Sequence, residues 1–456
     1  MGLASVVDSR PFHLRGNFAP VTEEVTAVDL PVEGGIPKEI RGRYLRNGPN
    51  PKSGESGHWF FGDGMVHGVE LGEGKARWYR NRWVRTRTLT EGTPFISPEG
   101  EVDLTTGVAN THVIGHAGRI LALVESSLPT ELTRELDTVG CYDFGGKLKT
   151  AMTAHPKICP RTGEMHFFGY AFVPPFLTYH RVSAAGELVQ SEVIEVPGPT
   201  MIHDFAITEN HVVFMDLPVC FDLERITPDV DTMPYRWRDD YGARVGIKPR
   251  GRAGSAGSPS PVRWYEIEPC YVFHPLNAYE ADGGRLVVEV ARYESLWRDD
   301  PGRFEPAKLH RWTVDTTAGR VHEEPLDDRA IEFPRIDERR VGLRHRYGYA
   351  VTNNLGAGIE MTNVESASLL KYDLVSGRTE VHDFGDHRIP SEGVFVPASE
   401  GAGEEEGWVL AYVYDRARDG SDLVILDATD FGGRPVATVR LPQRVPYGFH
   451  GSFIAE

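Results

Sequence analysis

The sequence predicts an all-β protein built as a β-propeller, and three observations lead to this prediction. Long amphipathic helical patterns are scarce across the 456 residues. Glycine and proline, present 49 and 32 times, are spread throughout and separate short runs rich in Val, Tyr, Phe, Trp and Thr. A hairpin-like unit, in which an alternating strand, a glycine-containing turn and a second strand follow one another, recurs along the chain.

The recurring unit is seen at six places, which are 67–80, 141–152, 179–190, 309–324, 369–384 and 423–439. Further hairpin patterns, such as ENHVVFMD and GGRLVVEVARY, lie between these segments. The intervals are uneven, but so many antiparallel hairpins in one chain favour the blades of a propeller, which closes radially and protects its strand edges. A large β-sandwich or two barrels would also use such hairpins, and the pattern alone leaves these alternatives open.

Two segments interrupt the hairpin pattern. Residues 248–260, KPRGRAGSAGSPS, are rich in Gly, Ser and Pro and are expected to form a mobile surface loop. Residues 398–407, ASEGAGEEEG, are expected to form an acidic turn that is solvated. The pattern continues on both sides of each segment, so neither is interpreted as a linker, and we expect a single domain over residues 1–456.

The composition excludes several classes of function. The 49 basic and 66 acidic residues give a formal net charge of −17, which disfavours binding to nucleic acid. The N-terminal segment has no apolar core or cleavage signature, and no apolar run is long enough to span a bilayer. We therefore expect a soluble, cytoplasmic protein that is at most peripheral on a membrane and has no obligate protein partner. The four cysteines form no CxxC pair and are expected to be free thiols in a reducing compartment: Cys141, Cys159, Cys220 and Cys270.

The seventeen histidines fall into different contexts. Some lie inside alternating strands, where an outward-facing polar residue is expected: His166, His180, His310 and His322. Four others follow apolar or small residues at the start of a strand and come directly before Pro, Asp or Gly: His155, His203, His274 and His450. Because the innermost strand of each propeller blade lines the axis, one histidine from each of four blades is able to reach a common point there.

Such a group of imidazoles is suited to a transition metal. Neutral imidazole binds Fe, Zn, Cu and Ni, whereas structural zinc normally uses cysteine, for which no pattern is present. Four histidines on an octahedral ion leave two positions open, which suits O₂ beside a substrate. Three glutamates in apolar, strand-like surroundings are candidates to accept the second ring N–H of such ligands: Glu125, Glu332 and Glu392.

Ten segments, in order and covering almost the whole chain, carry a family resemblance. The first five are GNFAPVTEEV (16–25), IRGRYLRNGPNP (40–51), HWFFGDGMVHG (58–68), THVIGHAGRILALVE (111–125) and AHPKICPRTGEMHFFGY (154–170). The others are MIHDFAIT (201–208), EFPRID (332–337), HRYGY (345–349), YVYDRARDGSDLVILDA (412–428) and GFHGSF (448–453). In these segments the chain resembles the carotenoid cleavage oxygenases.

The resemblance implies a seven-bladed β-propeller with a cap of loops and short helices over one face. It implies one Fe(II) per chain, bound by the four singled-out histidines, with the three glutamates as the partners of these ligands. Thr111 matches a family threonine near an open coordination position, where it would guide O₂. The implied reaction splits a conjugated carbon–carbon double bond into two carbonyl products with O₂ as co-substrate. It needs no organic cofactor, and the sequence has no G-x-G-x-x-G opening a helix, no P-loop and no H-E-x-x-H.

The substrate class is less narrowly implied. A carotenoid or apocarotenoid is the first expectation, and a phenylpropanoid or stilbene alkene is the alternative. The phenolic branch of the family often has a lysine directly before the first glutamate partner, where this chain has Val124. Two apolar segments, 172–179 and 218–237, are interpreted either as a tunnel mouth or membrane-contacting patch, or as ordinary packing of the cap.

Two other functions are compatible with the same architecture. A retinoid-type isomerase would share the metal site without consuming O₂, but those relatives carry longer, cysteine-bearing insertions that this chain lacks. A propeller that only binds a partner would be expected to have lost ligands, whereas every predicted ligand and glutamate position is occupied.

Overall fold

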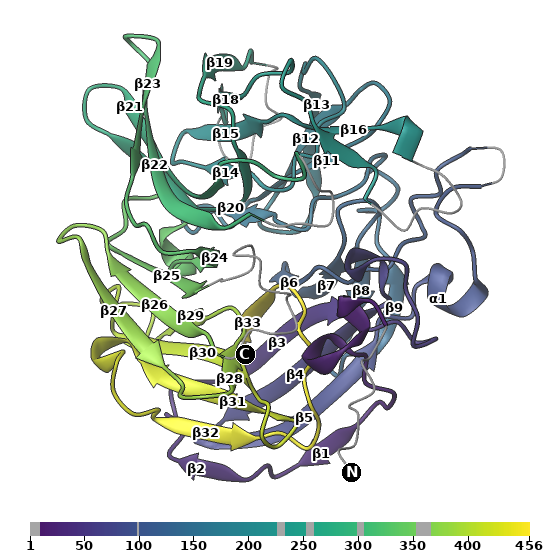
Figure 1. Cartoon of the computed structure of the whole chain (residues 1–456), viewed down its shortest axis with the longest axis vertical. Coiled ribbons are helices and arrows are strands. Elements are labelled where there is room, and N and C mark those ends of the chain that lie inside the picture. Colours follow the sequence, from purple (N-terminus) through teal and green to yellow (C-terminus); the bar gives the residue numbers. More distant parts are fainter. Residues whose placement is uncertain (1–9, 98–99, 226–232, 252–259, 299–304, 353–365) are drawn as a thin grey trace, which may run out of the picture.

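Seven β-sheets of four or more strands are arranged around a central axis in the part of the chain that the computed structural model describes (Figure 1). That part comprises residues 10–97, 100–225, 233–251, 260–298, 305–352 and 366–456. Consecutive strands within each sheet are antiparallel, and the innermost strands of neighbouring sheets contact one another around the axis. The predicted seven-bladed β-propeller is therefore confirmed.

Five blades follow one another directly along the chain. The first contains β6 (His112–His116), β7 (Arg119–Leu123), β8 (Thr130–Leu132) and β9 (Thr138–Cys141), and the second contains β10 (Lys157–Ile158), β11 (Met165–Tyr170), β12 (Leu177–Val182) and β13 (Leu188–Val193). The third contains β14 (Ala206–Ile207), β15 (His211–Asp216), β18 (Arg244–Pro249) and β19 (Arg263–Glu266). The fourth contains β20 (Tyr271–Ala281), β21 (Arg285–Tyr293), β22 (Ala307–Asp315) and β23 (Arg320–Pro325), and the fifth contains β24 (Ile331–Arg335), β25 (Tyr347–Thr352), β26 (Ser368–Asp373) and β27 (Arg378–Asp383).

Two blades join the two ends of the chain and close the ring. One contains β28 (Arg388–Pro390), β29 (Val394–Pro397), β30 (Gly407–Asp415), β31 (Gly420–Asp427), β32 (Ala437–Arg440) and the N-terminal β2 (Val32–Gly34). The other contains β1 (Thr26–Val28), β3 (Gly42–Pro49), β4 (Gly64–Gly72), β5 (Lys75–Trp83) and the C-terminal β33 (Gly451–Ala455). Purple and yellow segments accordingly lie side by side in Figure 1. Pairing strands from opposite ends of the sequence closes the ring and leaves no open edge between its first and last blades.

Short elements cover one face of the propeller. They are the two-stranded ribbon β16 (Val219–Phe221) and β17 (Tyr235–Trp237), the helix α1 (Arg87–Glu91), and the 3-10 turns η1 (Phe12–Leu14), η2 (Gly16–Phe18), η3 (Trp59–Phe61) and η4 (Leu223–Arg225). Two further 3-10 turns, η5 (Glu338–Arg340) and η7 (Ala428–Asp430), lie between strands of the blades. No helix among the described residues is long and apolar enough to cross a membrane.

Five of the six predicted hairpins form, and the one at 141–152 does not. Cys141 ends β9, and the residues after it turn back on themselves, because the backbone N–H of Leu148 donates to the carbonyl of Asp143 and Phe144 adopts a positive φ of 57°. The apolar side chains of this segment are buried between blades without pairing as strands: Phe144, Leu148 and Met152. Burial between sheets, rather than strand pairing, therefore produces the apolar pattern of this segment.

Both predicted excursions need correction. The first two residues of the glycine-rich segment 248–260 are the end of β18, where the buried Lys248 pairs with Glu192 at 3.0 Å. Residues 252–259, on which the predicted mobile loop falls, lie outside the described part. The acidic turn at 398–407 is more than a solvated connection. Glu404 accepts the backbone N–H groups of Arg346 and Tyr347, and Glu405 pairs with Lys371 at 2.9 Å. Charged side chains are thus used to join blades.

Two of the four strand histidines expected to face outward are buried instead. The ring of His166 lies 2.6 Å from the Tyr179 hydroxyl at Nδ1 and 2.9 Å from Arg250 at Nε2. His180 lies between the hydroxyls of Thr150 and Ser191, each at 2.8 Å. In a propeller both faces of a blade pack against neighbouring blades, so a polar side chain on either face is buried and must find a partner.

Candidate metal centre

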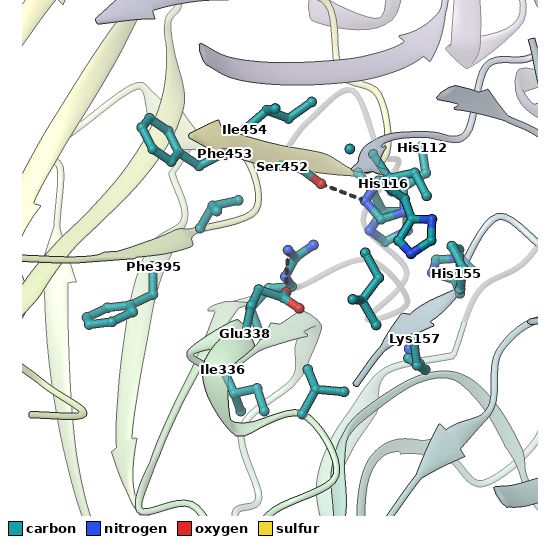
Figure 2. Close-up of a pocket in the computed structure, with 18 of the residues that line it drawn as sticks. His112, His116, His155, Lys157, Ile336, Glu338, Phe395, Ser452, Phe453 and Ile454 are labelled. Atoms are coloured by element: carbon teal, nitrogen blue, oxygen red, sulfur yellow. Dashed lines mark hydrogen bonds and ion pairs between the residues drawn. The ribbon is translucent and has the colours of Figure 1, made fainter. Parts of the chain in front are cut away.

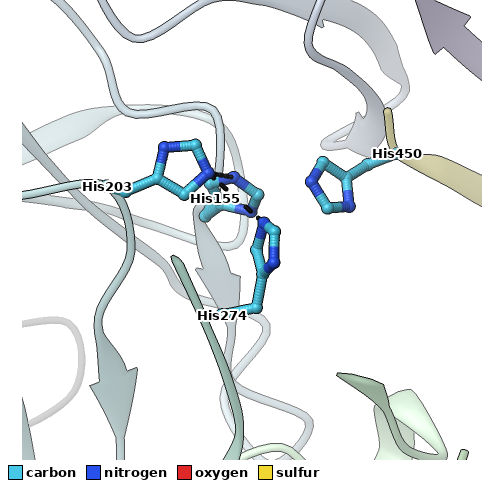
Figure 3. Close-up of side chains that lie close together, drawn as sticks. All are labelled: His155, His203, His274 and His450. Atoms are coloured by element: carbon cyan, nitrogen blue, oxygen red, sulfur yellow. Dashed lines mark hydrogen bonds between the residues drawn. The ribbon is translucent and has the colours of Figure 1, made fainter. Parts of the chain in front are cut away.

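The four histidines that precede Pro, Asp or Gly meet on the propeller axis (Figure 3). His155 and His203 come shortly before β10 and β14, the inner strands of two adjacent blades. His274 is within β20, where the register with β21 shifts on either side of Pro275, and His450 directly precedes β33. Local bends at inner strands therefore aim one imidazole from each of four blades toward a common point.

The nitrogen atoms of this cluster have the spacing of ligands to one ion. The Nε2 atoms of His155 and His203 are 3.0 Å apart, those of His203 and His274 are 3.3 Å apart, and one ring nitrogen from each of the four lies within 4.8 Å of the others. Two nitrogens bound at right angles to one ion at ~2.1 Å would be roughly 3.0 Å apart. No other such group of ligating side chains occurs in the described residues.

Three carboxylates determine the orientation of these rings. The Nδ1 atom of His203 lies 3.1 Å from Glu125, that of His274 lies 2.6 Å from Glu332, and that of His450 lies 2.9 Å from Glu392. Each ring therefore donates its Nδ1–H to a carboxylate, which leaves the Nε2 lone pair directed toward the axis.

The carboxylates are themselves held in place. Glu332 accepts from the backbone N–H of Phe333 and from the Tyr293 hydroxyl at 2.8 Å. Glu392 accepts from the backbone N–H of Gly451 at 2.9 Å, and the Arg335 guanidinium lies 3.3 Å away. Burial by itself would raise the pKa of both carboxyl groups, but these partners and the histidines outweigh it and lower both pKa values. Both groups are therefore carboxylates at neutral pH.

This donor set fits a cation. Burial lowers the pKa of His155 and His450 well below the ordinary value, so both rings are neutral. The pKa of His203 is instead raised, because the effect of burial is outweighed by the charge of Glu125 and its hydrogen bond. Imidazole nitrogens directed toward one another at 3.0 and 3.3 Å are suited to share a cation between them. The roles of the four histidines as ligands and of the three glutamates as their partners remain predictions.

His155 has a partner that the sequence analysis missed. Its Nδ1 atom lies 3.8 Å from the carboxylate of Asp204, which is 2% exposed and pairs with Lys157 at 2.8 Å. Asp204 directly follows His203 in the apolar segment MIHDFAI, and a carboxylate in such a segment is a signal that it has a buried partner. The fourth histidine thus also faces an acidic group, although not at hydrogen-bonding distance.

An apolar pocket of about 470 Å³ opens onto the cluster from the side of the cap. Its walls include Thr111, Val124 and three of the four histidines, the exception being His155. The Thr111 hydroxyl donates to Asn110 at 3.0 Å, and the Thr111 carbonyl accepts the backbone N–H of His450 at 3.0 Å. Thr111 is therefore at the boundary of pocket and cluster, and its role in guiding O₂ remains a prediction.

The two apolar cap segments contribute both to this pocket and to packing. Four side chains from these two segments line the pocket: Phe172, Phe221, Met233 and Tyr235. Phe172 stacks on Phe221 with ring centroids 4.3 Å apart, whereas Trp237 is buried in the core and Phe176 is half-buried. Val173 is 65% exposed beside them. The tunnel-mouth and packing interpretations each describe part of this region.

A second cavity, of about 710 Å³, reaches the cluster from the opposite side along the axis (Figure 2). It touches His155, His274 and His450, and charged and polar side chains form much of its wall. His112 lies in this wall beside the cluster, with its Nδ1 atom 2.8 Å from the carbonyl of Ala154 and its Nε2 atom 3.3 Å from the Ser452 hydroxyl. The cluster is thus located between an apolar pocket and a polar cavity.

Comparison with known proteins agrees with this geometry. The family model described as "Retinal pigment epithelial membrane protein" matches residues 18–455. The chain is 42% identical to a carotenoid cleavage oxygenase from Mycobacterium tuberculosis, over 99% of both chains, and 34% identical to a carotenoid 9,10(9′,10′)-cleavage dioxygenase from Arabidopsis thaliana, over 98% of this chain and 91% of that one.

Two solved structures have the same architecture. A lignostilbene dioxygenase from Pseudomonas brassicacearum superposes with a TM-score of 0.85 at 30% identity, covering 98% of this chain and 99% of that one. The apocarotenoid oxygenase of Synechocystis, in a Glu150Asp variant, superposes with a TM-score of 0.83 at 27% identity, covering 96% and 97%. With a family model matched over nearly its full length and a relative at 42% identity, the chain belongs to the carotenoid cleavage oxygenase family.

Proposed function

We propose that this protein is a non-haem Fe(II) dioxygenase that splits a conjugated carbon–carbon double bond with O₂ and releases two carbonyl products. The observation that carries the proposal is the group of four inward-facing Nε2 atoms, three of them oriented by carboxylates, at the inner end of an apolar pocket. The sequences of its relatives support the reaction class, because the most similar ones named above are alkene-cleaving oxygenases.

The iron would be held by the four histidines: His155, His203, His274 and His450. When bound, it would supply a site that binds and polarises O₂ next to the alkene. Thr111, in the wall of the pocket beside the cluster, would restrict what enters from the pocket side.

The chain's own residues have three tasks in this reaction. Glu125, Glu332 and Glu392 hold the imidazole rings in the orientation that leaves Nε2 free. The aromatic walls of the pocket position a planar conjugated chain and exclude water from the reacting bond. Since the cleaved double bond supplies the electrons for both new C=O bonds, the residues around it need no reductant and no organic cofactor.

A carotenoid or apocarotenoid is the substrate class that we propose first. The 42% identity with a carotenoid cleavage oxygenase over the whole chain supports it, as do the apolar walls of the pocket. Val124, where the phenolic branch often has lysine, lies in the pocket wall and offers no charge to a phenol.

A phenylpropanoid or stilbene alkene is the second candidate. The structural similarity to a lignostilbene dioxygenase at 30% identity favours it, together with hydroxyl groups in the pocket wall. The two substrate classes differ in length and polarity, so direct comparison of turnover separates them.

The test is anaerobic purification, metal analysis and measurement of O₂ uptake with β-carotene, an apocarotenal, resveratrol and isoeugenol. We expect one iron per chain and, with one substrate class, one O₂ consumed for each pair of carbonyl products identified by mass spectrometry. Isomerised substrate without O₂ uptake would indicate the isomerase reaction instead. A protein that retains no iron and is fully active would overturn the proposal.

A further inference from the structure

Two tyrosine hydroxyls face each other in the wall of the apolar pocket. The hydroxyl oxygens of Tyr170, at the end of β11, and Tyr235, at the start of β17, are 3.3 Å apart. Both side chains line the pocket that opens onto the four histidines. One comes from a propeller blade and the other from the cap, so the pair is formed only when the cap lies over the blade.

The two hydroxyls of the pair can form more hydrogen bonds than the one that joins them. Two hydroxyls contain two hydrogens, and their contact with each other uses one of them. No acceptor for the second hydrogen occurs among the residues that the structure describes. By contrast, two other hydroxyls in the same wall are engaged, because Thr111 donates to Asn110 and Tyr293 donates to Glu332.

The surroundings of the pair are apolar and close to the metal centre. Phe221 packs edge-on against Tyr235 with ring centroids 5.8 Å apart and stacks on Phe172. Burial, together with the negative charge of Glu125, raises the pKa of Tyr170 well above its ordinary value, and burial likewise raises that of Tyr235. Both phenols therefore keep their hydrogens, and Tyr170 lies within electrostatic reach of the carboxylate that orients His203.

We infer that the Tyr170–Tyr235 pair binds an oxygen atom of the substrate, so that the enzyme prefers conjugated alkenes with a hydroxyl or carbonyl group near the cleaved bond. This inference rests on the proposed function and narrows its substrate class. The remaining hydrogen donates to the ligand oxygen, and the tyrosine oxygens accept from a ligand hydroxyl. The pair supplies a polar contact to a phenol or an apocarotenal in a wall where Val124 supplies none.

The selectivity follows from the cost of leaving a hydroxyl unpaired in an apolar site. A ligand without oxygen would displace water from the pair without forming a hydrogen bond to either hydroxyl. Sites of this kind therefore bind the deoxy analogue more weakly. A neutral hydrogen bond of this kind corresponds to about a tenfold difference in the dissociation constant. The pair therefore discriminates between oxygenated and hydrocarbon ends, rather than between long and short chains.

The test is a cycle of protein variants and matched ligands. The iron-loaded protein is kept anaerobic, so that ligands bind without turnover, and dissociation constants are measured from quenching of tryptophan fluorescence. One ligand pair is 4-hydroxystilbene and stilbene, and the other is an apocarotenal and the hydrocarbon in which a methyl group replaces the aldehyde. The proteins are wild type, Tyr170→Phe, Tyr235→Phe and the double variant.

Tyr349→Phe is the matched control, because Tyr349 is 1% exposed in the core of two other blades and does not line the pocket. We expect wild type and this control to bind the oxygenated ligand about tenfold more tightly than its partner. The single variants should have a smaller preference and the double variant none. A preference in the stilbene pair alone identifies a phenol as the ligand, and one in the apocarotenal pair alone identifies a carbonyl.

Equal affinity of wild type for both members of both pairs would overturn the inference, as would a preference that survives in the double variant. Iron content and the far-ultraviolet circular dichroism of each variant establish that it is folded and loaded. Failure of the proposed function gives a different result from failure of this inference. The protein would then take up no O₂ in air with any substrate, while wild type would still prefer the oxygenated ligand and the double variant would still lose that preference.

Discussion

The two cavities that meet at the four histidines have opposite chemistry. The pocket under the cap is walled largely by aromatic and aliphatic side chains, whereas the axial cavity contains buried ion pairs such as Lys157–Asp204 and Arg335–Glu392. The axial ion pairs contact or adjoin His155 and His450, so they act on the rings themselves. Glu392 acts on the ligands from the axial side, whereas Glu125 and Glu332 line the cap-side pocket. Both sides therefore hold the metal centre, but the cap side alone offers largely apolar walls to the alkene.

The division predicts which measurement each side changes. Substitutions on the axial side should alter stability and metal retention, because they disturb buried charges. Substitutions on the cap side, apart from the histidines and their partners Glu125 and Glu332, should alter the affinity and turnover of the alkene while the iron content stays constant.

His203→Ala should abolish both iron retention and O₂ uptake, the largest effect expected. The change removes one of the four nitrogens and leaves Glu125 without its donor. Metal analysis after anaerobic purification measures the first effect and an oxygen electrode the second. His322→Ala, an exposed site on β23 away from the cluster, should retain iron and activity. An active His203→Ala protein with no iron would contradict the assignment.

Lys157→Met should lower the free energy of unfolding by about 3 kcal/mol, since it leaves the buried Asp204 carboxylate unpaired. Urea denaturation followed by circular dichroism measures the change, and Lys308→Met, an exposed site on β22, is the control. Adding Asp204→Asn to the variant should recover part of the loss. Alkene affinity should be unchanged, and a large change there would break the proposed separation between the two sides.

Glu332→Gln should preserve the fold and weaken iron binding by roughly 10- to 100-fold. Glutamine keeps the shape of the side chain but removes the charge that Nδ1 of His274 faces at 2.6 Å. Competition for the metal with a chelator of known affinity provides the measurement. Glu187→Gln, an exposed turn position, should bind iron like wild type. If Glu332→Gln bound iron with the affinity of wild type, Glu332 would have no role in iron binding.

Val124→Phe should reduce kcat/KM by about tenfold while the iron content stays at the wild-type level. The larger ring fills the pocket beside Glu125, and overpacking of this size costs about 1–3 kcal/mol where the wall does not give way. Initial rates of O₂ uptake at several alkene concentrations provide the value. Loss of iron in this variant would show that the cap side also determines metal binding.

Ser452→Ala should change iron content and kcat/KM by less than about twofold, the smallest effect expected. The Ser452 hydroxyl lies 3.3 Å from Nε2 of His112, which is long for a hydrogen bond. A neutral hydrogen bond of that length contributes about 1 kcal/mol or less to stability. The same metal and O₂ measurements apply. A tenfold loss of turnover would show that the axial wall takes part in the reaction.

Much of the candidate site was predictable because local sequence carried its signals. Each of the four histidines precedes a residue that bends or ends a strand, and each of the three glutamates lies in an apolar, strand-like segment. Five of the six hairpins predicted from the pattern form, since alternation and glycine turns are local properties. The number of blades and the identity of the metal came from the family resemblance.

Other features were missed because they depend on contacts between distant segments. The burial of His166 and His180 results from the packing of blades, and the failed hairpin at 141–152 owes its apolar pattern to the space between sheets. Asp204 was missed because its partner Lys157 is 47 residues away and belongs to another blade. The acidic turn at 398–407 was expected in solvent, but its carboxylates contact Lys371 and the backbone N–H of Arg346 in the preceding blade.

The sequence by itself determined which groups are able to bind a metal, which segments form hairpins and which carboxylates need buried partners, because these depend on residue type and short-range pattern. Only the tertiary structure decided that His155, His203, His274 and His450 converge, that Tyr170 meets Tyr235, and that a polar cavity and an apolar pocket lie on opposite sides of the centre. These features join residues that are 48 to 295 positions apart in sequence or come from different blades. Closure of the ring, in which the last strand pairs with the first blade, is what brings them together.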